Sequence, residues 1–169
     1  METKSLFIFN NISFVVKNKQ KKDVILLDNI SGNISSGEVL GILGPSGAGK
    51  TTLLNVLTQS AFDGVSYGNI LYNGKKISNK FLVNNCYIVN QQDYHWAFLT
   101  CEETIDYAIN LYGKSNSKEE TIKLRNSILD SVGLNSCRDT KVGNEFFKGL
   151  SGGQKRRLSI AIALVKKSK

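Results

Sequence analysis

One stretch of the chain has the composition and spacing of a phosphate-binding loop. It matches the pattern G-x-x-x-x-G-K-S/T and reads Gly44-Pro45-Ser46-Gly47-Ala48-Gly49-Lys50-Thr51. Glycines let the backbone curl so that successive N–H groups point at phosphate oxygens, and the start of a following helix adds further donors. Lys50 supplies a point charge for the β- and γ-phosphates, and Thr51 offers a hydroxyl to Mg²⁺. The stretch therefore predicts phosphate binding together with Mg²⁺.

The residues on either side of this loop are those that such a site requires. Residues 38–43 are predicted to form a buried strand that leads into the loop, and apolar residues at helical spacing follow it: Leu53, Leu54, Val56 and Leu57. The alternative is a glycine-rich turn before an ordinary helix. The four fixed positions match by chance in on the order of one chain of this length in a hundred or two, so pattern and flanks favour phosphate binding.

A second glycine-containing motif, LSGGQ, lies far downstream. Ser151 and Gln154 form a capping-box pattern before an apolar helix over 155–165, which is a purely structural interpretation. Gly152 and Gly153 argue against that interpretation, because each glycine costs roughly 1 kcal/mol of helix stability relative to alanine. Exposed glycine N–H groups at a helix start can bind an anion, so the motif predicts a second phosphate contact.

With both motifs in this order, the chain resembles the ATP-binding cassette (ABC) family, whose signature sequence is LSGGQ. The resemblance runs from Leu6 to Lys166. It implies an α/β fold, a P-loop NTPase of the ABC ATPase type, with an N-terminal antiparallel β part, an α/β core and a helical insert; the C-terminal part of the core is missing. ATP and Mg²⁺ are the implied cofactors, and Thr52 would add a contact to the α-phosphate.

The resemblance also implies a partner for the signature motif. Its residues would contact the γ-phosphate of ATP held on the phosphate loop of a second ABC ATP-binding domain, in a head-to-tail dimer; they are Ser151, Gly152, Gly153 and Gln154. Between the two motifs, residues 89–93 resemble the family's Q-loop. Gln91 is assigned as the glutamine that contacts Mg²⁺ and the attacking water, because its spacing to Leu99-Thr100 fits best. Gln92 is the neighbouring alternative, and an ordinary polar loop is the structural one.

The adenine-contacting residue stays open between Phe14 and Val16. Phe14 is the nearest aromatic residue in the early β region and is favoured as a core residue, whereas the family's usual position falls on Val16. His95, the single histidine, lies beside the Q-loop and does not correspond to the family's switch histidine. Trp96 is expected at the surface or facing a partner.

Local patterns and the resemblance divide the chain into parts. A partial ABC ATP-binding domain spans 6–169, with a β-rich and P-loop part over about 6–99, a helical subdomain over about 100–150 and the signature helix over 151–169. Strands are expected over 6–9, 12–16, 24–27, 30–34 and 86–89, and a hairpin at the Asn73-Gly74 turn. Helices are expected over 102–112, ending at Gly113, and from the Ser117–Glu120 capping box to Gly133.

Residues 132–164 resemble the G (White/pleiotropic-drug-resistance) subfamily. That resemblance implies an ATP-binding domain that couples ATP binding and hydrolysis to transmembrane transport of lipids, sterols or xenobiotics. An ABC transmembrane domain would hold it at the cytoplasmic face of a membrane. The family's Walker B aspartate, catalytic glutamate and switch histidine have no counterpart before Lys169, so this chain alone is expected to be inactive.

Composition limits the other possibilities. Across 169 residues no apolar run approaches the ~18 needed to span a bilayer, and the three scattered cysteines fit reduced thiols. The net charge of +8 comes from scattered basic clusters, Lys155 to Arg157 among them, that are not interleaved with aromatic residues. They are expected to be ordinary solvated surface, so no nucleic-acid partner is expected. Two alternatives remain: a non-catalytic nucleotide-binding or interfering module, and a soluble ABC ATPase that acts on nucleic acid or the ribosome.

Overall fold

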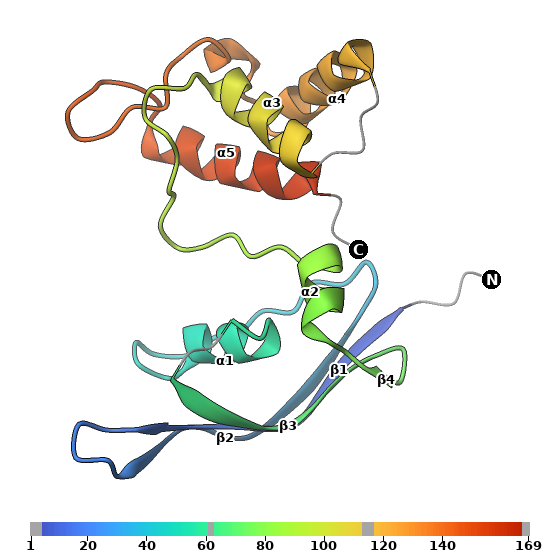
Figure 1. Ribbon diagram of the computed structural model, residues 1–169, viewed down its shortest axis with the longest axis vertical. Helices are drawn as coiled ribbons and strands as arrows, with labels where there is room; N and C mark the ends of the chain where they lie inside the picture. The colour runs from blue at the N-terminus through green and yellow to red at the C-terminus, as the bar shows by residue number, and fades with distance from the viewer. Residues whose placement is uncertain (1–4, 61–62, 113–116, 167–169) are drawn as a thin grey trace. The chain divides into compact units, whose positions relative to one another are not determined.

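The computed structural model describes residues 5–60, 63–112 and 117–166, and the chain divides into two units, Met1–Asn84 and Asn85–Lys169 (Figure 1). The first unit carries a sheet and the phosphate loop. The second carries three longer helices and the signature motif. In the described part of the chain, no helix is both long enough and apolar enough to cross a membrane.

The sheet of the first unit is antiparallel throughout. Its strands are β1 (Leu6–Lys17), β2 (Asp23–Ser35), β3 (Gly64–Tyr72) and β4 (Lys75–Lys76), in the order β2-β1-β3-β4. The turn between β3 and β4 has positive φ angles at Asn73 (49°) and Gly74 (75°), as a tight two-residue hairpin requires. The predicted Asn73-Gly74 hairpin is therefore confirmed.

The polar breaks at Asn10-Asn11 and Asp28-Asn29 do not end strands. The four short strands predicted from them form two long ones, β1 and β2, and the ladder is irregular between Phe9 and Ile12. Asn11 and Asn29 have φ angles of 53° and 51°, and Asn11 Nδ2 donates to Asn29 Oδ1 at 2.6 Å. Asparagine tolerates this left-handed conformation, so the breaks are bulges within continuous strands.

Two predicted strands, 38–43 and 86–89, are wrong: both segments lack regular secondary structure. Val39 and Leu43, expected in a buried strand, are 98% and 94% exposed. A strand is stable only when a neighbour pairs with its backbone N–H and C=O groups. In the described residues the sheet consists of β1 to β4, and none of these pairs with either segment. The apolar composition of residues 38–43 is therefore not sufficient for a strand before the phosphate loop.

Two helices complete the first unit: α1 (Lys50–Leu57) directly after the phosphate loop, and α2 (Asn79–Asn85). Helix α1 lies over one face of the sheet (Figure 1). Its buried side chains are Leu53, Val56 and Leu57, three of the four residues whose spacing predicted the helix, while Leu54 is 42% exposed. This apolar stripe fixes the direction in which the helix start, and therefore the loop, projects from the sheet.

The second unit is built from α3 (Cys101–Tyr112), α4 (Lys118–Ser131), the 3-10 turn η1 (Asn135–Cys137) and α5 (Gly152–Val165). One buried cluster joins all three helices; it contains Cys101, Ile105, Ala108, Ile109, Ile128, Leu129, Leu134, Cys137, Val142, Leu150, Leu158, Ala161 and Val165. The signature helix therefore shares one core with the helices predicted to form the insert.

The predicted helix signals in this unit are confirmed where the structure describes them. Ser117 caps α4 by accepting from Glu120 N at 3.1 Å, and Gly133, just beyond the helix, has a φ of 64°. Gly113, the predicted stop of the preceding helix, lies outside the described residues. Burial and the neighbouring Cys137 raise the pKa of the Cys101 thiol to about 12, so this cysteine stays a protonated core residue at neutral pH.

Candidate nucleotide-binding site

The phosphate loop curls around the ammonium group of Lys50. Lys50 Nζ donates to the carbonyl oxygens of Gly44 at 2.9 Å and Pro45 at 2.6 Å, and Ala48 N donates to the oxygen of Pro45 at 3.2 Å. Two of the three ammonium donors therefore fix the charge at the loop, and one is left for a ligand. Pro45, Ser46, Gly47 and Ala48 are exposed, so the loop faces solvent.

Helix α1 begins at the loop, and no acidic side chain of its own first turn offsets its positive end. Its first turn contains no acidic residue, and Gly49 at the N-cap provides no side-chain cap. Thr51 is exposed in this first turn and Thr52 is half-buried beside it. A helix start of this kind offers N–H donors and a positive potential to an anion. The loop, Lys50 and the helix start therefore lie together in the first unit, where they could offer donors and positive charge to an anion.

Gly49 is required both by its backbone angles and by its surroundings. Its φ is 86°, and a Cβ there would lie 3.0 Å from Leu27 Cδ2 and 3.2 Å from the carbonyl oxygen of Leu26. Gly47 also has a positive φ, 82°, but a Cβ there would meet nothing within 4 Å. The loop therefore passes close to β2 at Gly49 and runs free at Gly47.

Replacing Gly49 by alanine is expected to destabilise the protein more than the matched change Gly47→Ala. Both substitutions place a side chain at positive φ, which costs about 1–2 kcal/mol. Only Gly49→Ala adds a steric clash with β2. Urea titration of both variants measures the difference, and equal free energies of unfolding would show that the contact with β2 is relieved without cost.

The signature motif starts α5 with a complete capping box, as predicted. Gln154 N donates to Ser151 Oγ at 3.3 Å, and Ser151 N donates to Gln154 Oε1 at 2.8 Å. A Cβ at Gly152 would meet nothing within 4 Å, and one at Gly153 would meet only Arg157 Nη1 at 3.9 Å. Packing among the described residues therefore gives no reason for either glycine, although both weaken the first turn of the helix.

The structure brings together the members of each motif but places the motifs in different units. The phosphate loop belongs to the first unit, whereas Gln91 and the signature residues belong to the second. Gln91 lies on an exposed bend, and the hydroxyl of Tyr94 donates to Oε1 of the neighbouring Gln92. Of the two adenine candidates, Phe14 is only 4% exposed and packs in the sheet core, whereas Val16 is half-buried.

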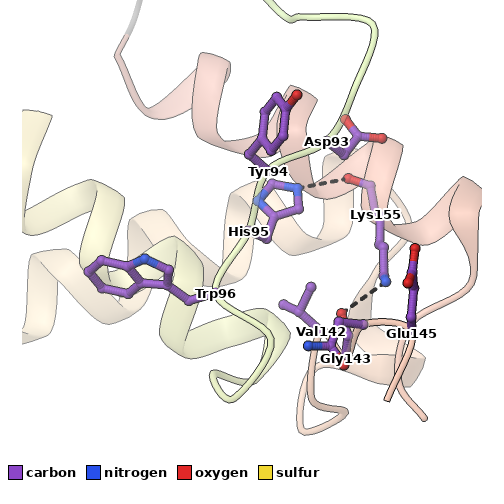
Figure 2. A pocket seen from close by; sticks show the side chains of 9 residues that line it. Asp93, Tyr94, His95, Trp96, Val142, Gly143, Glu145 and Lys155 are labelled. Carbon is purple, nitrogen blue, oxygen red and sulfur yellow. Dashed lines mark hydrogen bonds between the residues drawn. The ribbon is translucent and has the colours of Figure 1, made fainter. Parts of the chain in front are cut away.

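A polar cluster beside the signature helix did not emerge from the sequence. Asp93 and His95, in the segment after Gln91, meet Arg156 and Ser159 on α5. Figure 2 shows the adjoining pocket, a cavity of ≈ 530 Å³ between 93–96, the loop 142–145 and Lys155. Lys155 and Arg156 belong to a charge cluster that the sequence pattern assigns to ordinary solvated surface. A contact across more than 60 residues leaves no local pattern that would have identified it.

Comparison with known proteins agrees with the two motifs. The sequence profile of the family described as ABC transporter matches residues 27–169. The chain is 37% identical to ABC transporter G family member 22 of Arabidopsis thaliana over 83% of this chain and 19% of that protein. It is 36% identical to G family member 8 of Dictyostelium discoideum over 93% of this chain and 26% of that protein.

A further relative, G family member 7 of Arabidopsis thaliana, is 40% identical over 93% of this chain and 22% of its own length. The chain thus spans about a quarter or less of these curated relatives. Both glycine motifs lie inside the matched residues. The chain belongs to the ABC transporter family and corresponds to the ATP-binding domain of its G-family members.

Proposed function

We propose that this chain binds ATP through its phosphate loop and, in the intact protein, couples ATP binding and hydrolysis to transmembrane transport. The observation that carries the proposal is that the loop, the Lys50 ammonium and the start of α1 lie together in the first unit. We take ATP as the bound nucleotide because the chain belongs to the ABC transporter family. The names of the relatives support transport as the process that is driven.

Each site residue has a distinct role in this proposal. Backbone N–H groups of the loop, to which Pro45 cannot contribute, would surround the β-phosphate. The Lys50 ammonium would neutralise the β- and γ-phosphates, and Thr52 would contact the α-phosphate. The Thr51 hydroxyl and Gln91 would hold Mg²⁺, which would supply charge stabilisation for the transferred phosphoryl group. Val16, half-buried on β1, is the adenine contact, since Phe14 would have to leave the core to take that role.

The signature glycines support a head-to-tail dimer. Gly152 and Gly153 weaken α5, and no contact within the part of the chain that the structure describes requires them. A partner that approaches their backbone closely would explain both glycines. In the proposed dimer, residues 151–154 contact the γ-phosphate of ATP bound by a second ABC ATP-binding domain. We also propose that the chain divides into a β-rich and P-loop part over about 6–99, a helical subdomain over about 100–150 and the signature helix over 151–169.

An exposed aromatic surface on the second unit supports a membrane partner. Trp96 is 52% exposed and stacks on Phe98 with ring centroids 5.9 Å apart, and it packs against Tyr107 at an interplanar angle of 62° with ring centroids 4.9 Å apart. Exposed aromatic clusters of this kind are typical of protein interfaces. An ABC transmembrane domain is the proposed partner, which would hold the chain at the cytoplasmic face of a membrane. Lipids, sterols or xenobiotics are the proposed substrates, from the resemblance to the G subfamily.

The proposal is tested by the nucleotide specificity of binding. A fluorescent ATP analogue is titrated into the intact protein with Mg²⁺ and then displaced by ATP, ADP, AMP or adenosine. ATP and ADP are expected to displace it far better than AMP or adenosine, because the site recognises the β-phosphate through the loop and Lys50. Displacement by adenosine as readily as by ATP would refute phosphate recognition, and binding without any hydrolysis would favour the non-catalytic module.

A further inference from the structure

We propose that Arg156 is a positioning residue that ties the Gln91 segment to the signature helix. It holds both ends of the Gln91-Gln92 stretch, so that Gln91 and the signature glycines at the start of α5 move as one piece. This inference rests on the proposed function, since it concerns the Mg²⁺-binding and water-contacting role of Gln91. It assigns a task to a residue that the sequence pattern leaves as surface charge.

The contacts of Arg156 bracket the two glutamines. Its Nη1 donates to the carbonyl oxygen of Asn90, directly before Gln91, and to Asp93 Oδ1, directly after Gln92, at 3.3 Å. The Asp93 side chain is only 17% exposed, whereas that of Arg156 is 42% exposed. One guanidinium group on α5 therefore fixes the backbone on one side of the stretch and a largely buried carboxylate on the other.

Ser159 and His95 reinforce the same attachment. Ser159 Oγ donates to Asp93 Oδ1 at 2.5 Å and lies 3.0 Å from His95 Nε2, which is also 3.2 Å from the carbonyl oxygen of Lys155. Figure 2 marks the hydrogen bond between His95 Nε2 and the carbonyl oxygen of Lys155 with a dashed line. Because a carbonyl only accepts, His95 Nε2 is the donor in this bond. The segment is thus held by its backbone at Asn90 and by side chains at Asp93 and His95.

Helix α5 also contacts the loop that precedes the signature motif. Lys155 Nζ donates to the carbonyl oxygen of Gly143 at 2.9 Å, which Figure 2 shows across the pocket from His95. Lys155 and Arg156 directly follow the signature residue Gln154. Helix α5 therefore carries the signature glycines at its start and, two residues beyond that motif, anchors the Gln91 segment through Arg156.

A solvated ion pair would not produce this arrangement. An exposed surface pair stabilises a protein by about 0–1 kcal/mol and fixes little. Here one arginine nitrogen, one serine hydroxyl and one histidine ring secure a segment that has no regular secondary structure of its own. Such a segment takes its conformation from its side-chain anchors, so the position of Gln91 depends on α5. Small displacements of a catalytic group cost up to about a hundredfold in rate.

The test compares Arg156→Gln with Arg157→Gln in the intact protein. Arg157 is the matched control because it is the next residue on the same helix and is exposed. Three quantities are measured: ATP affinity, kcat for phosphate release and the Mg²⁺ concentration that gives half-maximal turnover. Arg156→Gln is expected to lower kcat at least about tenfold and to raise the Mg²⁺ requirement. ATP affinity stays within about twofold, since the phosphate loop lies in the other unit.

A double-mutant cycle separates positioning from a structural role. If Arg156 acts through Gln91, Arg156→Gln costs far less in a Gln91→Asn background than in the unmutated protein. Arg156→Lys can reach one of the two oxygens and is expected to restore part of the loss. Ser159→Ala, which removes one bond to Asp93, shifts kcat and the Mg²⁺ requirement in the same direction but less. If Arg156→Gln does not fold, the Ser159→Ala variant alone still tests the attachment.

The outcomes distinguish this inference from the proposed function. Three results would each overturn the inference. They are a normal kcat in Arg156→Gln, a lower kcat without any change in the Mg²⁺ requirement, and a loss of kcat of equal size in the Gln91→Asn background. An unmutated protein that neither binds nor hydrolyses ATP would instead reject the proposed function, and the inference with it. Normal turnover by the unmutated protein together with an unaffected Arg156 variant removes the inference alone.

Discussion

Replacing Lys50 by alanine in the intact protein is expected to lower kcat/KM for ATP hydrolysis by about a hundredfold or more. Removing one preorganised charge or donor at a reacting group costs about 10²–10³ in rate. Lys50 is held in place within the loop, because its ammonium donates to the carbonyl oxygens of Gly44 and Pro45 at 2.9 and 2.6 Å. A hundredfold loss corresponds to about 2.7 kcal/mol of transition-state stabilisation.

The measurement is steady-state phosphate release with Mg-ATP. Lys75→Ala is the matched control, because Lys75 is an exposed lysine on β4 of the same unit. Lys50→Met keeps the length of the side chain and removes only the charge, so it separates electrostatics from loop packing. Activity of Lys50→Ala within about threefold of the unmutated protein would mean that the loop does not carry the reacting phosphates.

Replacing Gly153 by alanine is expected to change stability and turnover in opposite directions. Alanine in place of glycine stabilises a helix by up to about 1 kcal/mol. A Cβ at Gly153 finds only Arg157 Nη1, at 3.9 Å, so the chain accommodates the new methyl group. In the proposed dimer the same methyl group stands between the backbone of α5 and the γ-phosphate. Turnover should therefore fall at least about tenfold, while the midpoint of unfolding rises.

Thermal unfolding and ATP turnover are measured on the same preparations. Arg157→Ala, one turn further along α5, serves as the control that changes a side chain without adding one near the phosphate. A Gly153→Ala variant that is both less stable and less active would point to a purely structural role of the glycine. Unchanged turnover together with higher stability would remove the phosphate contact from the proposal.

The sequence predicted those elements whose signals are local. The hairpin at Asn73-Gly74, the capping boxes at Ser117 and Ser151 and the apolar stripe of α1 are confirmed. Each of these signals depends on residues no more than a few positions apart, where side-chain chemistry acts directly on the neighbouring backbone. The same holds for the curl of the phosphate loop, which its glycines and Lys50 form within eight residues.

The wrong predictions are those that inferred strands, or the ends of strands, from local composition without knowing which segments pair by backbone hydrogen bonds. Residues 38–43 have the apolar composition of a buried strand, yet Val39 and Leu43 are almost fully exposed. Asn10-Asn11 and Asp28-Asn29 carry turn composition, yet each lies inside a continuous strand. Whether a segment forms a strand depends on a partner that supplies backbone hydrogen bonds, and no residue within the segment determines that.

By itself the sequence determined the chemistry of this protein: two glycine motifs, a lysine and a threonine at fixed spacing, and hence membership of the ABC transporter family. Only the tertiary structure decided which residue holds the Gln91 segment in place and which aromatic residue is buried. Arg156 on α5 reaches Asn90 and Asp93 across more than 60 residues of chain, and Phe14 is withdrawn into the sheet core. The phosphate loop is a short backbone segment, so a local sequence pattern reveals it. The attachment of the Gln91 segment to α5 depends on contacts between residues far apart in the chain, and these leave no periodic pattern in a single sequence.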